Sequence, residues 1–159
     1  MRSKIGAFLI GAITGAVVLA AAIFIMMPKM MLTVHQSKYS TVEETCMKLQ
    51  ASIKANGWNS PAVRDMNKTI ADSGAVMQRQ VRLVELCNAA YAKDILTTNP
   101  EVSTLMPCAW GVYEGDDGKV YISGMNMGLM GKLFGGNISR VMGRSVPSEE
   151  KNMLKDVIE

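Results

Sequence analysis

The stretch that decides the fold runs from Val81 to Met130 and reads VRLVELCNAAYAKDILTTNPEVSTLMPCAWGVYEGDDGKVYISGMNMGLM. Its first residues, 81–87, alternate in the way that is typical of a strand. Asn88 then suits the N-cap of a helix, because its side chain can accept a hydrogen bond from a free backbone N–H. This helix is predicted to continue through Leu96.

The second half of the stretch predicts a β-hairpin. One strand is expected over 103–114 and the returning strand over 119–124, with Gly-Asp-Asp-Gly at 115–118 as the turn. Four apolar residues of the first strand fall on one face: Met106, Cys108, Trp110 and Val112. We expect this face to pack against a core.

Upstream of this stretch the sequence predicts another strand and another helix. Residues 31–37 alternate apolar and polar side chains, so Leu32 and Val34 are expected to face the core. A capping box at Ser40 begins a helix that Gly57 is expected to close. The apolar positions of this helix share one face: Val42, Cys46, Leu49 and Ile53.

The remaining elements complete one compact domain, predicted over 30–159 with its central part at 31–130. They are a short strand over 62–66, a short helix over 67–73, and a last helix over 148–158 with Ser148 as its N-cap. This order of elements predicts an α+β fold, with a mainly antiparallel sheet and helices packed on one of its faces.

Three runs of this sequence resemble an uncharacterised family, domain of unknown function 302: VELCNAAYAKDIL, NPEVSTLMPCAWGVYE and DGKVYISGMN. The residues that match the family pattern are Cys87, Asn88, Pro107, Cys108, Val112 and Glu114. The resemblance implies a small α+β fold similar to the TATA-binding-protein topology and a tendency to form homodimers. It implies no activity, because the family has no established one.

The N-terminal segment 1–29 is predicted to be a transmembrane anchor. Residues 5–27 carry no charge and have basic residues on both sides. At about 1.5 Å rise per residue this run gives roughly 35 Å of helix, which exceeds a hydrocarbon core of about 30 Å. A cleaved signal peptide is the alternative, with Ala20-Ala21-Ala22 as its cleavage site.

The flanking charges suggest an orientation for this anchor. Arg2 and Lys4 form a short basic tail before the first apolar segment, as in a signal anchor. We therefore expect a single-pass protein of the inner (plasma) membrane, with a cytoplasmic N-terminus and the domain on the exported, periplasmic side. Gly11 and Gly15 form a GxxxG pattern on which another helix could pack. Glycine is also common in such spans without this role.

Cys87 and Cys108 are the best candidates for a functional site, and three explanations stay open. In an oxidising compartment the two residues either pack in the core or form a disulfide. If they stay reduced, they offer with Met106 or Met125 the soft sulfur ligands that suit copper(I). A thiol of lowered pKa would instead exchange disulfides or carry a sulfane sulfur.

Other metal and haem sites are not expected. The sequence has a single histidine and no CxxC pair, which argues against a zinc site and against c-type haem.

A glycine- and methionine-rich segment at 124–147 contains basic residues and no acidic ones. Placed on one helix, its apolar residues, Phe134 among them, fall on one flank and Lys132, Arg140 and Arg144 on the other. We predict that these residues contact the membrane or a partner. Its glycines oppose a continuous helix. They leave open a loop that a partner approaches, a flexible insert, or a flank that closes the core.

Two function classes stay open. The first is a non-catalytic accessory domain, in a homo-oligomer or beside a larger membrane partner. The second is a redox or metal-handling domain that uses Cys87 and Cys108 for copper or sulfane sulfur. A net charge of +3 is too small to predict nucleic-acid binding. Catalysis by carboxylates is not favoured, since Glu114, Asp116 and Asp117 fall at the expected hairpin tip.

Overall fold

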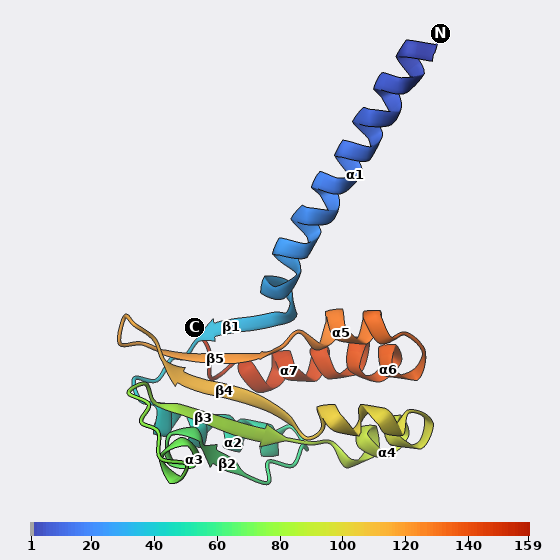
Figure 1. Cartoon of the computed structure of the whole chain (residues 1–159). Coiled ribbons are helices and arrows are strands. Elements are labelled where there is room, and N and C mark those ends of the chain that lie inside the picture. Colours follow the sequence, from blue (N-terminus) through green and yellow to red (C-terminus); the bar gives the residue numbers. More distant parts are fainter. Residues whose placement is uncertain (1) are drawn as a thin grey trace. The chain divides into compact units, whose positions relative to one another are not determined.

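The computed structural model describes residues 2–159, with side chains at residue 11 and from residue 13 onward (Figure 1). The chain divides into two compact units: the first ends at Leu32 and the second spans Thr33–Glu159.

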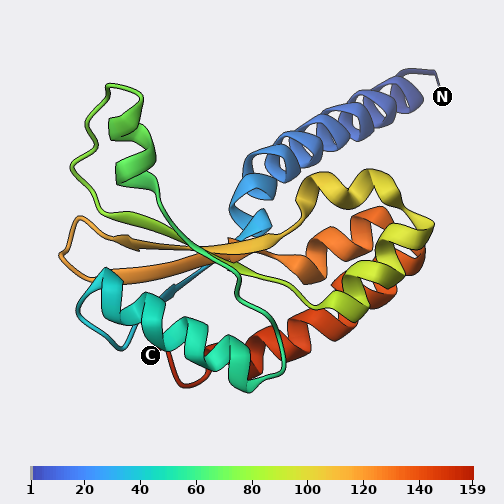
Figure 2. The ribbon, with the colours of Figure 1, turned by 90° about the horizontal axis from the view of Figure 1, so that it is seen from below.

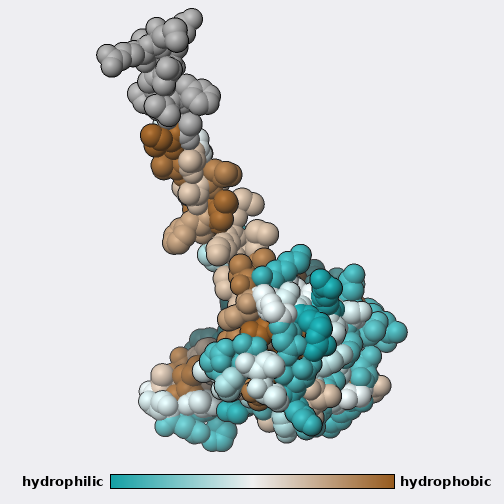
Figure 3. Space-filling view, turned by 90° about the vertical axis from the view of Figure 1, so that its right-hand side faces the viewer, coloured by the Kyte–Doolittle hydropathy of each residue, from teal (hydrophilic) through white to brown (hydrophobic). Residues whose placement is uncertain are grey.

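Helix α1, Arg2–Met31, makes up the first unit. The side chains described along it up to Met30 are exposed, with Phe24 at 80%. Figure 3 shows that the surface formed by its described side chains is largely apolar. Among the residues that the structure describes, this is the one helix long and apolar enough to cross a membrane, with Ile13–Met31 as the qualifying span. The apolar N-terminal helix predicted from the sequence is therefore present.

The second unit is built on a five-stranded sheet with the order β1-β5-β4-β3-β2. Its strands are β1 (Leu32–Gln36), β2 (Val63–Asp65), β3 (Val81–Leu86), β4 (Cys108–Glu114) and β5 (Val120–Met125). Neighbours from β2 to β5 pair antiparallel, with Val84 opposite Trp110 and Val112 opposite Ile122. The apolar residues of one face thus line up across the central strands.

The helices confirm the predicted α+β class. They are α2 (Val42–Ala55), α3 (Met66–Asp72), α4 (Ala89–Thr98), the 3₁₀ helix η1 (Pro100–Leu105), α5 (Met127–Phe134), α6 (Gly136–Arg140), the π-helical turn η2 (Val141–Ser145) and α7 (Val146–Leu154). Figure 2 shows α2 and α7 on the same face of the sheet. The core lies between these helices and the sheet, and it contains Leu49, Ile53, Val84, Leu86, Trp110, Ile122 and Met153.

The strand predicted over 103–114 begins later than expected. Residues Pro100–Leu105 form η1, and β4 starts only at Cys108. Pro100 favours a helical start, because its fixed φ suits the first helical position. Pro107 has no N–H to donate to a neighbouring strand, so the ladder begins after it.

Two predicted helix starts are also wrong. The N-cap of α2 is Thr41 rather than Ser40, and its hydroxyl accepts a hydrogen bond from the N–H of Glu44. Ser148 lies inside α7, because the chain enters this helix without a break from η2. The buried face predicted for α2 and the closure at Gly57, whose φ is +79°, are confirmed.

Strand β1 is present, but its apolar side chains do not face the core. Leu32 and Val34 are 57% and 53% exposed, whereas Thr33 and His35 are half-buried. The hydroxyl of Thr33 donates to the backbone oxygen of Gly124 on β5. Alternation fixes which residues share a face, but not which face is covered.

The segment after β5 is not one helix. It is broken at Gly135 and Gly136, which have φ values of +70° and +52°. Past this break the chain turns back, and Ile138, Val141 and Met142 are buried in the domain's own core. Of the three explanations for this segment, closing the core accounts for its second half.

The returning chain depends on a close backbone approach. A Cβ atom on Gly131 of α5 would lie 2.3 Å from the nitrogen of Gly143 in η2. At that distance the backbone must move. We expect Gly131→Ala to destabilise the domain by about 2 kcal/mol, the usual cost of overpacking. Urea unfolding of the full chain in mild detergent, followed by tryptophan fluorescence, measures this loss.

Gly128→Ala is the matched control on the same helix. Its Cβ would meet Asn126 Oδ1 at an ordinary 3.5 Å, so this variant should be as stable as the parent. Equal stability of the two variants would contradict the backbone contact.

Candidate functional site

Two adjoining cavities meet at the start of β4. The larger has a volume of about 250 Å³ and the smaller about 30 Å³. Residues that line both are Pro107, Cys108, Met127 and Met142. Cys108, the first residue of β4, therefore lies between the two spaces.

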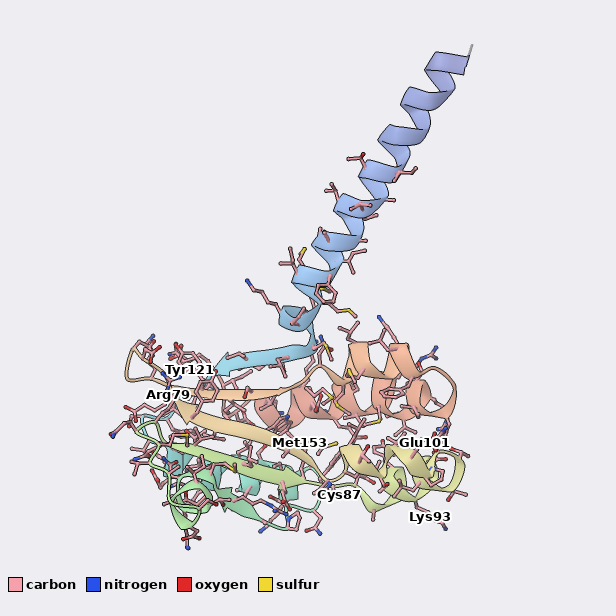
Figure 4. The ribbon with its side chains drawn as sticks, in the orientation of Figure 1. Arg79, Cys87, Lys93, Glu101, Tyr121 and Met153 are labelled. Carbon is pink, nitrogen blue, oxygen red and sulfur yellow. The ribbon has the colours of Figure 1, made fainter. Side chains whose placement is uncertain are left out.

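The structure distributes the predicted sulfur residues between these cavities. Met125 lines the larger cavity, while Cys87 and Met106 line the smaller one, and Cys108 lines both. Cys87 follows β3 directly (Figure 4). It exchanges two backbone hydrogen bonds with Asn59. Both cysteines are free thiols.

The thiol of Cys108 is held in its protonated form. Burial is the main cause, and the nearby Glu150 and Cys87 add to it, so that the pKa of Cys108 is raised to about 11. Burial likewise raises the pKa of Cys46, in the core face of α2, to about 11. Neither thiol has the lowered pKa that a nucleophilic cysteine requires.

Glu150 of α7 places a carboxyl group in the wall of the larger cavity. Burial raises its pKa to about 7, partly opposed by a hydrogen bond from Trp110. The ring of Trp110 is held against Gly124 on β5, where a Cβ atom would come within 2.5 Å of it. This glycine thus makes room for the indole beside the carboxyl group.

The neighbouring Glu149 reaches in another direction. It accepts hydrogen bonds of 2.5 Å from Trp58 Nε1 and from the hydroxyl of Tyr91. The two rings meet edge to face with centroids 5.9 Å apart. Trp58 and Tyr91 also line the smaller cavity, so this cluster fixes α7 beside it.

The other residues matched to the family pattern have different surroundings. Asn88 is the N-cap of α4, as predicted, and accepts from the N–H groups of Ala90 and Tyr91. Val112 is fully buried, and Glu114 is exposed at the end of β4.

The residues predicted to contact a membrane or partner do not form one group. Lys132 and Phe134 are exposed on α5. Arg140 pairs with Asp94 of α4, and Arg144 is exposed in η2. In α1, nothing in the described chain lies within 4 Å of where a Cβ would stand on Gly11 or Gly15.

Sequence reasoning missed several residues of the site: Trp58, Met127, Met142, Glu149 and Glu150. The sequence pattern assigns the last helix by its apolar positions and gives its acidic residues no role. The signal that was available is the pair of adjacent acids inside an amphipathic helix. Nothing in the sequence places them against the two tryptophans, because those contacts span 40 to 91 positions of the chain.

The chain is similar to known proteins in sequence family and in fold. The family model described as "Domain of unknown function DUF302" matches residues 33–159. The chain belongs to this family. No curated protein matches it.

A solved structure of this family has the same fold. The crystal structure of an uncharacterized conserved DUF302 protein from Bacillus stearothermophilus is similar with a TM-score of 0.70 at 17% identity. The match covers 80% of this chain and 98% of that one. At this identity the likeness establishes the DUF302 fold alone.

The buried carboxyl group of Glu150 makes stability depend on pH. Its folded-state pKa of about 7 lies above the ordinary 4.5, so the folded state holds more protons between these values and stability falls as pH rises through them. Glu150→Gln stays neutral. Relative to the parent, we expect its free energy of unfolding to increase by on the order of 1–2 kcal/mol when the pH is raised from 5 to 8. Urea unfolding of the full chain measures this difference.

Glu114→Gln is the control for this measurement, since Glu114 is exposed on the same domain. It should follow the parent at both pH values. A Glu150→Gln variant that also follows the parent would refute the buried titration.

The raised pKa of Cys108 predicts slow alkylation. At pH 8 we expect Cys108 in the folded protein to react with iodoacetamide at least tenfold more slowly than in urea, because little thiolate is present. Mass spectrometry of the peptide that contains Cys108 measures both rates. Reaction of the folded protein at the unfolded rate would instead restore the thiol-chemistry explanation.

Proposed function

We propose that this DUF302 protein is a membrane-anchored, non-catalytic accessory domain. Helix α1 would hold the domain on the exported side of the inner membrane, with the N-terminus in the cytoplasm, beside a larger membrane partner or a second copy. The observation that carries this proposal is the exposed, apolar α1, which ends at Met31 and continues at Leu32 directly into an edge strand. A helix that leaves such side chains exposed needs an apolar environment.

Exposed apolar side chains on the domain support a surface contact. Val34 on β1 is 53% exposed, and Leu133 and Phe134 on α5 are 58% and 49% exposed. Lys132 precedes them on the same helix and is also exposed. Apolar and basic residues in this combination suit the headgroup region of a membrane or an apolar partner.

One face of the sheet supports association with a partner. Leu83, Gly111 and Tyr113 lie on the face opposite the buried Val84 and Val112, and each is half-buried. Tyr113 and Tyr121 stack there with ring centroids 5.9 Å apart. A partially exposed sheet face with small and aromatic residues suits an interface.

The protonation of the site supports a role without catalysis. Cys108 is held as a neutral thiol, which makes it a poor nucleophile. The carboxyl groups of Glu114, Asp116 and Asp117 lie exposed around the hairpin, where water screens them.

Fractionation of cells that express the full chain tests the anchor. We expect the protein to stay in the membrane after carbonate extraction, with its N-terminal residues intact by mass spectrometry. Protease added from the exported side should remove the domain. In mild detergent a larger membrane protein or a second copy should co-purify in fixed stoichiometry.

A variant that starts at residue 30 is the control and should leave the membrane pellet at high salt. A mature chain that begins after Ala22 and stays soluble would eliminate the anchor and support the signal-peptide alternative.

Handling of a soft metal ion is a second candidate function. It is favoured by one observation, the thiols of Cys87 and Cys108 in the wall of one cavity together with Met106. Transport of sulfane sulfur fits less well, because it needs a thiolate and the pKa of Cys108 is raised.

A further inference from the structure

The larger cavity has a wall with unusual chemistry. Four sulfur-containing residues line it, Cys108, Met125, Met127 and Met142, together with Glu150. These residues come from β4, β5, α5, η2 and α7, so five separate elements bring them together. Thioethers are neutral, soft donors that hold copper(I) and bind zinc or magnesium poorly.

The charge of the residues around the larger cavity also favours a cation. None of the residues that line the larger cavity is basic, and Glu150 carries its one carboxyl group. Glu150 also lines a neighbouring cavity together with Lys151 and His35. Among the ion pairs of the described residues, none involves Glu150. A buried carboxylate without a positive partner is costly, and a monovalent cation in the cavity would neutralise it.

Access to the cavity is open at one side. Thr104, Pro107 and Met125 line it and are exposed, whereas Met127 and Met142 are each 4% exposed. An ion would enter at Met125 and pass to the buried sulfurs. The cavity therefore opens to solvent on one side, as ligand-binding pockets do, and is not enclosed within the core.

We propose that the larger cavity is a copper(I) site in which the thioethers of Met125, Met127 and Met142 bind the ion and Glu150 balances its charge. The thiol of Cys108 completes the sulfur wall. Copper stays in the +1 state throughout, and any proton that leaves Glu150 or Cys108 on binding goes to solvent. This inference rests on the second candidate function and is independent of the anchor.

Competition with bicinchoninate under anaerobic conditions tests the site. Copper(I) is added to the full chain in detergent at pH 8, and its transfer from the coloured chelate is read by absorbance. The parent should take up one ion more tightly than the double variant Met125→Leu/Met142→Leu, which should bind at least tenfold more weakly. Leucine keeps the volume of methionine closely enough for the core to fold.

The matched control is Met47→Leu/Met153→Leu. It also changes one exposed and one fully buried methionine, and neither lines the cavity. This variant should bind as the parent does. Glu150→Gln keeps the shape of the side chain and removes its charge, so it should also weaken copper(I) binding, and zinc should not compete.

Three results would overturn the site: no uptake by the parent, equal uptake by the cavity variant and its control, or full displacement by zinc. None of them bears on membrane attachment, which the fractionation measures separately. Conversely, a soluble mature chain that binds copper(I) through these methionines would keep the site and reject the anchor.

Discussion

The structure of the domain depends on how α7 is held. Two consecutive glutamates on this helix accept hydrogen bonds from the two tryptophans of the chain, Glu149 from Trp58 and Glu150 from Trp110. Each tryptophan belongs to a different part of the domain, one after α2 and the other on β4. A half-buried carboxyl group that loses its donor is left without a partner, so these two hydrogen bonds hold α7 against both parts of the domain.

The same helix connects the fold to the site. Glu150 lies in the wall of the larger cavity, and η2 just before α7 contributes Met142 to both cavities. The close approach of Gly131 and Gly143 brings η2 against α5, which carries Met127. Packing of the C-terminal segment therefore sets the shape of the cavity as much as the sheet does.

Sequence reasoning predicted the elements that local pattern determines. The hairpin, the Asn88 cap and the buried face of α2 follow from spacing and turn chemistry within a few residues. It failed for features that depend on contacts between residues far apart in the chain. The exposed side of β1 depends on which face the helices cover, and the break at Gly135 depends on where the chain must turn. Cys108 was found as a candidate, but the nearby Glu150 was not, because the two residues come close only in the folded chain.

The contact between Gly124 and Trp110 limits how substitutions can reshape one wall of the larger cavity. A Cβ at position 124 would lie 2.5 Å from the indole of Trp110, so this position of β5 accepts no larger residue unless the ring moves. The size of the cavity can instead be changed at Met125 on its exposed side, or at Met127 and Met142 on its helical side. The β5 side therefore fixes where the indole of Trp110 stands in the cavity wall.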